Sequence, residues 1–366
     1  MRYIILTIVL CAGLAASATA QQQPAGEVYR ANQGTVGVIT GMEGGTYAQT
    51  GADLTILDDG TLRVLPIIGK GSLQNLSDIL YLRGVDVGFV QADALTYAKQ
   101  HNLYPTLTQS IRYIAKLYDE EIHVLARSDI SSLQDLNDQR VNVDVAGSGS
   151  AMTAEILLDA LNIKPKIEHQ KQVDGLEALK RGEIAAIIQV SGAPMPLLAR
   201  LGSAGGLHLL PIELNQALAQ TYLPDQFTHD TYPALVPVEE AVPTLAVGDV
   251  MAVFAWQPHT ERFNKVARFV DTFFNKFDQF LQPPRHPKWR EVNLTAEVPG
   301  WTRFQAAQDW LAQHARPNVA QDTTQARFAA FLSDAKVGGS TLSDTAKEEL
   351  FRQFLSWDKQ RQAARP

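Results

Sequence analysis

Two glycine-rich turns contain the residues best suited to hold a small anion. Gly44-Gly45-Thr46-Tyr47 follows the apolar run Thr35–Thr40, and Gly147-Ser148-Gly149-Ser150 follows Val141–Ala146. At Gly45 and Gly149 a backbone N–H can point outward with almost no side-chain bulk around it. Hydroxyl groups that could fix the orientation of a ligand occur in the same turns, at Thr46, Tyr47, Ser148 and Ser150. These residues suit the binding of a carboxylate or a similar small anion.

Other polar residues near the turns could either bind a ligand or serve a structural role. Gln91 and Gln189 each end an apolar run and could supply amide groups from two sides of a ligand. Ser72 could bind the ligand or cap a helix that starts at Leu73. Three charged residues could face solvent or touch the ligand, and an acid here would suit the ammonium group of an amino-acid-like ligand. They are Glu43, Lys70 and Asp93.

The same residues give little support for catalysis. No H-E-x-x-H, G-x-S-x-G or G-x-x-x-x-G-K-S/T motif occurs, and the eight histidines are scattered without metal-ligand spacing. Ser148 and Ser150 have no His or Lys at a spacing that would activate them. Glu120 and Glu121 are adjacent on a predicted strand, so they face opposite ways and cannot form an acid/base pair. We expect no enzyme activity, no cofactor and no metal.

A repeated order of elements would position the turns. Strands are predicted at 35–40, 62–68 and 85–90 and again at 141–146, 166–169 and 184–188, with helices between them. In each copy an Arg-Gly pair precedes a strand that ends in glutamine, seven residues after the glycine: Gly84 to Gln91 and Gly182 to Gln189. Alternating strands and helices indicate a parallel sheet covered by helices. The repeat therefore predicts two similar α/β lobes.

Two pairs of extended runs could connect the lobes. The runs are 111–118 with 122–127, and 244–247 with 250–256. Two crossings predict a hinged pair of lobes. We assign 33–120 plus 245–366 to the first lobe and 121–244 to the second. An aromatic stripe at helical spacing, from Phe263 to Phe277, predicts core packing, and helices at 328–332 and 346–357 would form a packed C-terminal extension.

The first residues predict export. Met1-Arg2 gives a positive start, Ile4–Ala16 is apolar and Ala18-Thr19-Ala20 is a cleavage pattern. This order is typical of a signal peptide, so we expect residues 1–20 to be removed after Ala20 and the product to be periplasmic. An uncleaved anchor is the alternative, but the 13 residues of the apolar stretch fall short of the ~20 that a membrane span needs.

Composition excludes several classes of function. The chain has 366 residues, of which 45% are apolar, and a single core stops growing near ~250–300 residues, so two lobes are expected. Its 39 acidic and 32 basic residues give a net charge of −7, which argues against a nucleic-acid partner. The one cysteine, Cys11, lies in the predicted signal peptide. The exported chain would therefore have no disulfide and no thiolate nucleophile.

Several motifs, taken as an ordered set, resemble the TAXI-type solute-binding subunits of tripartite ATP-independent periplasmic (TRAP) transporters. They are Gly44-Gly45-Thr46-Tyr47, Gly71-Ser72 with Asn75-Leu76, Val87–Asp93, Gly147–Ser150 and Val190–Pro194. The resemblance implies a type II periplasmic-binding-protein fold, that is, two doubly wound α/β lobes joined by hinge crossings. An extra helical region would follow at the C-terminus. The ligand-lining positions that it implies are Thr46, Tyr47, Ser72, Gln91, Asp93, Ser148, Ser150 and Gln189.

The resemblance also implies a function. A receptor of this kind closes on a small organic acid or amino acid and delivers it to TRAP-type integral membrane subunits. Met42-Glu43 and Ala48-Gln49 depart from the family pattern beside the ligand position, so no particular substrate can be transferred. Two other functions stay open. One is a receptor of the same fold for an ATP-driven (ABC) importer or a sensor kinase, and the other is a secreted serine hydrolase that uses Ser148 or Ser150.

Overall fold

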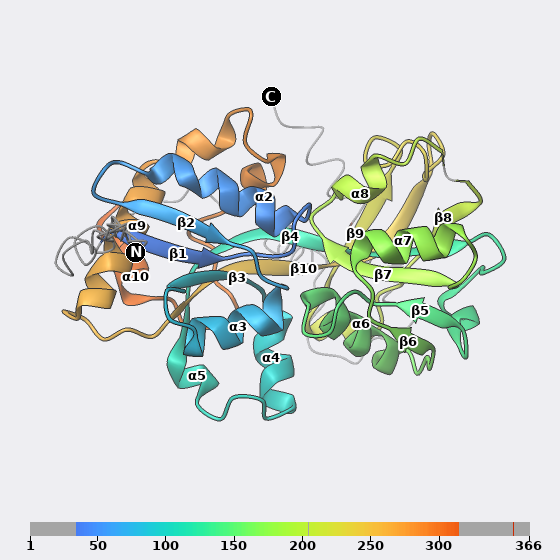
Figure 1. The fold of residues 1–366 in the computed structure, drawn as a ribbon, viewed down its shortest axis with the longest axis horizontal. Coiled ribbons are helices and arrows are strands. Elements are labelled where there is room, and N and C mark those ends of the chain that lie inside the picture. Colours follow the sequence, from blue (N-terminus) through green and yellow to red (C-terminus); the bar gives the residue numbers. More distant parts are fainter. Residues whose placement is uncertain (1–33, 204, 315–353, 355–366) are drawn as a thin grey trace, which may run out of the picture.

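The chain folds into two α/β lobes that lie side by side along the long axis of the molecule (Figure 1). This structure is a computed structural model, and it describes residues 34–203, 205–314 and 354. The predicted signal peptide lies outside these residues. So do the helices predicted at 328–332 and 346–357, apart from Phe354. The predicted α/β class is confirmed.

The first lobe contains a parallel sheet with the strand order β2-β1-β3. Its strands are β1 (Thr35–Ile39), β2 (Arg63–Ile67) and β3 (Val87–Gln91). Helices connect and cover them: α2 (Thr46–Asp53), α3 (Ser72–Tyr81), α4 (Asp93–Gln100) and α5 (Leu107–Ser110). All five residues of β3 are buried, as expected for a central parallel strand with helices on both faces.

The second lobe repeats this arrangement with the strand order β6-β5-β7. Its parallel strands are β5 (Arg140–Asn142), β6 (Lys166–Glu168) and β7 (Ala186–Ser191), with helices α6 (Gly149–Ala160), α7 (Gln172–Lys180) and α8 (Pro196–Ala199). Strands β8 (Leu207–Leu209) and β9 (Leu223–Thr228) pair with the connecting strands.

The repeated Arg-Gly pair ends a helix in both lobes. Gly84, after α3, has a φ of 92°, and Gly182, after α7, has a φ of 72°. Only glycine adopts this left-handed conformation at little cost, and it lets the chain leave the helix and enter the next strand. That strand is β3 in the first lobe and β7 in the second. The repeat found in the sequence is therefore a repeat of structure.

Two long strands connect the lobes. Strand β4 (Ile111–Arg127) has 17 residues and β10 (Ala241–Phe254) has 14, and the two pair antiparallel along most of their length. At a rise of ~3.3 Å per residue, β4 alone spans roughly 55 Å. Each predicted pair of extended runs is thus one continuous strand, and the two strands join the strands of both lobes into one sheet. The lobe boundaries at 120/121 and 244/245 stay a prediction, and they fall inside these two strands.

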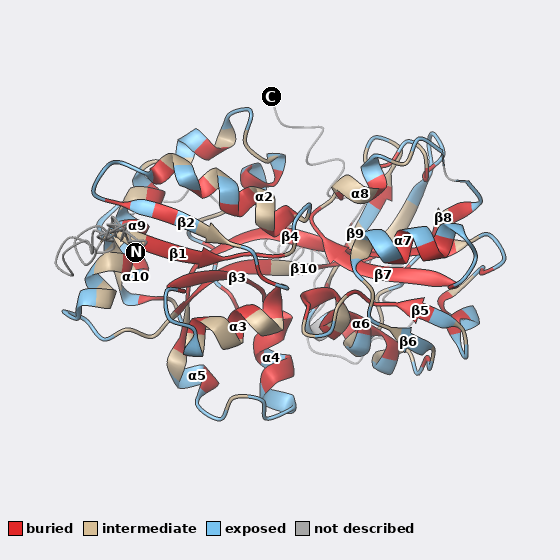
Figure 2. Ribbon diagram, in the orientation of Figure 1, coloured by how far each residue is buried: buried red, intermediate tan, exposed pale blue. Residues whose placement is uncertain are grey.

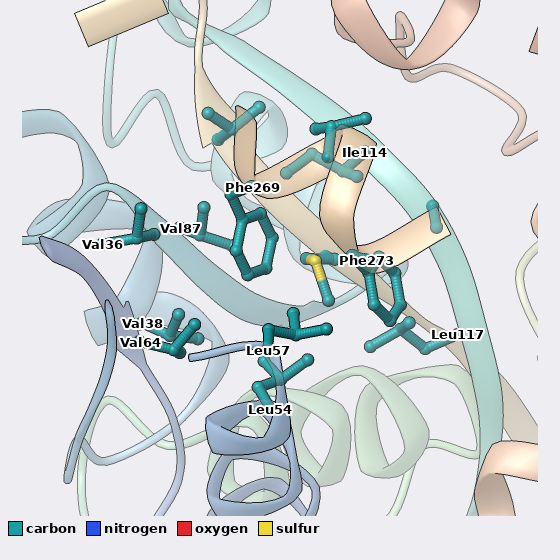
Figure 3. Packing of buried hydrophobic residues seen from close by; sticks show 14 of the residues in the cluster. Val36, Val38, Leu54, Leu57, Val64, Val87, Ile114, Leu117, Phe269 and Phe273 are labelled. Carbon is teal, nitrogen blue, oxygen red and sulfur yellow. The ribbon is translucent and has the colours of Figure 1, made fainter. Parts of the chain in front are cut away.

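The first lobe's core forms where an amphipathic helix covers the sheet. Helix α9 (Glu261–Asn275) buries Val266, Phe269, Val270, Phe273 and Phe274, which recur at three- and four-residue spacing. Phe269 and Phe273 lie among apolar side chains of the sheet and of the short helix Leu54–Leu57 that follows α2 (Figure 3). Each such side chain contributes about 1.5–3 kcal/mol when it is buried. The prediction that the aromatic stripe is core is confirmed, and the buried strands run through both lobes (Figure 2).

The chain beyond Pro283 packs onto the first lobe. Trp289 is fully buried in the short helix Pro287–Glu291, lies 4.6 Å from the ring of Phe280, and donates from Nε1 to Asp53 Oδ2 at 2.9 Å. Helix α10 (Gln305–Gln313) then packs against α9. Within the described residues this segment is the packed extension that we expected.

The same segment places a buried lysine at the middle of β4. Lys288 Nζ donates to Glu121 Oε1 at 2.6 Å and to Glu291 Oε2 at 2.9 Å, and the Lys288 side chain is 4% exposed. Glu121 Oε2 also accepts from the backbone N–H of Ala193, in the second lobe. Burial alone would lower the pKa of Lys288, but the two carboxylates outweigh it and hold that pKa above its usual range. Lys288 therefore connects the C-terminal segment to both lobes.

Removal of this lysine should destabilise the fold strongly. Lys288→Met leaves the Glu121 charge buried without a cation, so we expect the free energy of unfolding in urea to fall by about 3–5 kcal/mol. Adding Glu121→Gln should restore part of the loss, because no uncompensated charge remains there. The control is Lys180→Met, which breaks a half-exposed pair with Glu177 and should cost less than ~1 kcal/mol. Similar losses in the two single variants would contradict this account.

Candidate functional site

Three helices point their N-termini at one small cavity between the lobes. Helices α2 and α3 come from the first lobe and α6 from the second, and their capping residues are Gly45, Gly71 and Ser148. The first backbone N–H groups of a helix have no partner within the helix, and the aligned peptide dipoles make this end positive. The cavity has a volume of about 50 Å³. Its walls can therefore donate several hydrogen bonds to an anion.

The structure brings most of the predicted residues to this cavity. Those that line it are Gly45, Thr46, Tyr47, Ser72, Gln91, Ser148, Gly149 and Ser150. They come from the N-terminal ends of α2, α3 and α6 and from the C-terminal end of β3. Ligands of parallel α/β sheets gather at this end of the strands. The prediction of one shared cleft is consistent with this placement.

Direct contacts across the cavity show that the lobes are closed. Thr46 Oγ1 lies 3.0 Å from Ser191 Oγ, and the backbone N–H of Gln74 donates to the carbonyl of Gly147 at 3.2 Å. A Cβ atom at Gly149 would overlap Gln91 Oε1 and would lie 2.8 Å from Ser72 Oγ. Residue 149 must therefore be glycine if α6 is to approach the first lobe this closely.

Ser72 does not cap α3. Gly71 occupies the cap position, and Ser72 is the first helical residue. Its Oγ donates to Gln91 Oε1 at 2.8 Å and accepts from the backbone N–H of Gln91 at 3.0 Å. Since Gln91 Nε2 donates to Thr153 Oγ1 of the second lobe at 3.3 Å, Ser72 fixes a side chain that connects the lobes. Ser72 therefore lies at the cleft and not at the helix cap, and its contact with a ligand stays a prediction.

Asp93 and Gln189 do not line the cavity, which corrects two predicted positions. Asp93 begins α4 and its Oδ2 accepts from Thr153 Oγ1 at 3.0 Å and from Tyr222 OH at 2.9 Å. Its side chain is thus directed behind the cleft. Gln189 is fully buried on β7. It shares a strand face with Ser191, which does line the cavity, but it lies one pleat repeat deeper in the lobe.

The two other charged residues near the turns differ in position. Lys70 lines the cavity, and its backbone N–H donates to Gln74 Oε1 at 2.9 Å. Glu43 is exposed in the turn before α2 and is not part of the lining. An ammonium group in the cavity would therefore not meet Glu43.

Sequence reasoning missed Glu120, a carboxylate in the lining. Glu120 Oε2 accepts from Tyr47 OH at 2.7 Å, whereas Glu121 is directed to Lys288 and Ala193. The predicted opposite orientation of these two residues is confirmed. Burial and then the charge of Asp249 raise the pKa of Glu120 well above its usual range. Asp249 lies on β10, so spacing along the chain gives no sign of this neighbour.

Seven further lining residues were not predicted as ligand positions: Gly41, Met42, Gly71, Asp144, Gln172, Val190 and Ser191. Asp144 has a φ of 71° and its Oδ2 accepts from Gln172 Nε2 at 3.2 Å. Ser191 follows Gln189 and Val190 on β7 and belongs to the motif Val190–Pro194. That motif was the available signal for this side of the cavity.

The serine hydroxyls hold backbone groups. Ser148 Oγ accepts from the backbone N–H of Ala151 at 3.1 Å, and Ser150 Oγ accepts from that of Val190 at 2.9 Å. Among the described residues neither hydroxyl is hydrogen-bonded to a histidine or a lysine. In that same part of the chain, no three His, Cys, Asp or Glu side chains are grouped to hold a metal ion. The two hydroxyls therefore fix the backbone at the start of α6 and at β7.

The fold and the inter-lobe cavity define a type II periplasmic-binding-protein fold. Each lobe has its central parallel strands in the order of the other, and two antiparallel strands cross between them. A model of the NMT1-like family matches residues 38–294, more than two thirds of the chain. The chain belongs to the NMT1-like family.

Three solved structures show what the chain is similar to. Holo ArgBP from T. maritima is 13% identical, with 69% of this chain and 93% of that chain covered and a TM-score of 0.39. Tv2483 bound to L-arginine is 14% identical, covering 74% and 98%, with a TM-score of 0.43. The substrate binding protein of an amino acid ABC transporter is 14% identical, covering 68% and 97%, with a TM-score of 0.39.

A disulfide should form across the closed cleft. In Thr46→Cys/Ser191→Cys the two sulfur atoms would replace hydroxyls that lie 3.0 Å apart, and Cys11 is the only native cysteine. Mild oxidation of the chain from Gln21 onward should therefore consume both thiols, as measured by thiol titration and gel mobility. In the control, Thr50→Cys/Ser191→Cys, the first cysteine lies one helical turn away, and its thiols should stay free. Free thiols in both variants would contradict the closed arrangement.

Proposed function

We propose that the protein is an extracytoplasmic solute receptor that binds the carboxylate of a small organic acid or amino acid between its lobes. The convergence of three helix N-termini, from both lobes, on one cavity is the observation that supports this proposal most strongly. Unpartnered N–H groups stabilise negative charge locally. A net charge of −7 is therefore no obstacle to anion binding at this point.

Binding would favour the closed arrangement. A carboxylate held by α2 and α3 on one side and by α6 on the other makes all of its contacts only when the lobes meet. A ligand shifts such an equilibrium by its difference in affinity for the two states. The strands β4 and β10, which cross between the lobes, are the connection about which hinged closure would take place.

We further propose that the closed receptor delivers its ligand to TRAP-type integral membrane subunits. The ordered motifs from Gly44 to Pro194 support this partner, and the signal peptide expected before Gln21 supports a periplasmic location. In the part of the chain that the structure describes, no helix has the length and apolar character to cross a membrane. An ABC importer or a sensor kinase is the alternative partner. A gene for a large multi-spanning TRAP-type subunit next to this gene would favour the first assignment.

A thermal-shift screen tests the binding function. The chain from Gln21 onward, freed of carried-over ligand, is mixed with dicarboxylates, 2-oxoacids, 2-hydroxyacids and amino acids. A ligand at ~100 times its Kd should add about 2.7 kcal/mol of stability and raise the melting temperature. Gly149→Ala, whose new Cβ would overlap Gln91, should lose at least ~90% of that shift, while Gly202→Ala, with open space around residue 202, should keep it. No shift with any compound would contradict the proposal.

A secreted hydrolase predicts a different result. Incubation with a serine-directed fluorophosphonate would then label Ser148 or Ser150 covalently. We expect no adduct by intact-mass measurement, because both hydroxyls accept backbone hydrogen bonds and neither has a basic partner among the described residues. A stoichiometric adduct at either serine would support the hydrolase instead.

A further inference from the structure

Two buried carboxylates lie at the hinge end of the cleft. Glu120 comes from β4 and lines the cavity, and Asp249 comes from β10 and is fully buried. The Tyr47 hydroxyl interacts with both carboxylates. It donates to Glu120 Oε2 at 2.7 Å, and its pKa is raised by burial and then by the charge of Asp249. One phenol supplies only one proton to two acids.

Asp249 is buried without a hydrogen bond of full geometry to either carboxylate oxygen within the described residues. The Tyr47 hydroxyl and the backbone N–H groups of Val250 and Val90 lie close enough to lower its pKa, but burial outweighs them and raises that pKa. An unpaired polar group in such a position costs about 1–3 kcal/mol, and more when it is charged. Burial is the main cause that raises the pKa values of Tyr47, Tyr118 and Glu120, and the negative charge of Asp249 is the second. Asp249 does not line the cavity itself, but it is paired with the cavity-lining Gln91 across β10 and β3, so the two side chains lie on the same face of the sheet.

The nearby lysines are already paired. Lys116 Nζ donates to Asp119 Oδ1 at 2.6 Å, and Lys288 Nζ donates to Glu121 and Glu291. Asp93, which also acts on Glu120, accepts only from the hydroxyls of Thr153 and Tyr222. In the described part of the chain, Glu120 and Asp249 thus have no salt-bridge cation of their own. Two such carboxylates cannot both be ionised unless a cation joins them.

We propose that Tyr47, Glu120 and Asp249 form a cation subsite of the cleft, and that it selects ligands that carry an ammonium group beside their carboxylate. This inference rests on the proposed function, because the carboxylate is assigned to the helix N-termini that border the same cavity. The cavity of about 50 Å³ leaves room for few atoms, so the two charged groups of the ligand must be close together. A small α-amino acid has this chemistry.

The subsite makes a prediction about protons. An ammonium group lets both carboxylates stay ionised, whereas a ligand with a hydroxyl in its place leaves the pair to share one proton. The complex with a 2-hydroxyacid should therefore hold about one proton more than the complex with the matching amino acid. Because the amino acid displaces that shared proton on binding and the hydroxyacid does not, the affinity for the amino acid relative to the hydroxyacid should rise with pH, by up to tenfold per pH unit.

Calorimetry with matched ligands tests this. The pairs are glycine with glycolate, alanine with lactate, and glutamate with 2-hydroxyglutarate, each titrated between pH 6 and 8 in two buffers of different ionisation enthalpy. We expect the amino acid of the best-bound pair to bind at least tenfold more tightly at pH 7.5, and the two proton balances to differ by about one.

Two variants locate the effect. Glu120→Gln and Asp249→Asn should each reduce amino-acid affinity at least tenfold and abolish the difference in proton balance, with hydroxyacid binding retained. Glu43→Gln removes an exposed acid of the neighbouring turn and should change affinity less than twofold. Thermal melting checks that the variants fold, and the wild-type proton balance is decisive if they do not.

The outcomes separate the two proposals. Hydroxyacid binding that equals or exceeds amino-acid binding, with equal proton balances, would overturn the cation subsite and leave the carboxylate receptor intact. Failure of every amino acid and organic acid to bind would overturn the receptor, and the subsite with it. An amino-acid preference that survives both Glu120→Gln and Asp249→Asn would also overturn the subsite.

Discussion

The pairing of β4 with β10 is the constraint on which the rest of the structure depends. The two strands lie at the centre of one sheet that runs through both lobes, so the lobes cannot be separated without breaking this ladder. The ladder also carries charged residues through the centre of the molecule, where Asp119, Glu120, Glu121 and Asp249 are all buried or nearly so. Buried carboxylates need partners. Lys116, Lys288 and the hydroxyl of Tyr47 supply such partners, and the cleft offers a place for a further one.

Closure and ligand binding follow from the same arrangement. The parallel strands of each lobe end at the cleft, so the helices that follow them begin there and expose their N–H groups. Glycine at 149 lets α6 come within contact of Gln91, and Glu121 accepts hydrogen bonds from the C-terminal segment and from the second lobe at once. Polar groups from both sides therefore meet only in the closed arrangement. A carboxylate would add the contacts that make this arrangement more stable than an open one.

Sequence patterns predict what is local and leave out what depends on the third dimension. The two glycine-rich turns and the repeated Arg-Gly pairs predicted the lobes, because each belongs to one βα unit. The sequence predicts the first crossing as two runs because Asp119-Glu120-Glu121 interrupts the apolar pattern. The partners of these carboxylates come from other elements, and the strand continues through all three residues. Symmetry with Gln91 suggested Gln189, but one pleat of β7 separates it from the cavity. Asp249 had no signal at all, because its neighbour Glu120 is far along the chain.

The central claim is that N–H groups from both lobes hold one carboxylate. The most direct measurement is the proton chemical shift of the backbone amides at Thr46, Ser72, Gly149 and Ser150 during titration with the acid that stabilises the protein most. Hydrogen bonds to a carboxylate move amide protons downfield. The account predicts downfield shifts in both lobes that follow a single saturation curve. Shifts confined to one lobe, or none at these residues while the ligand binds, would contradict it.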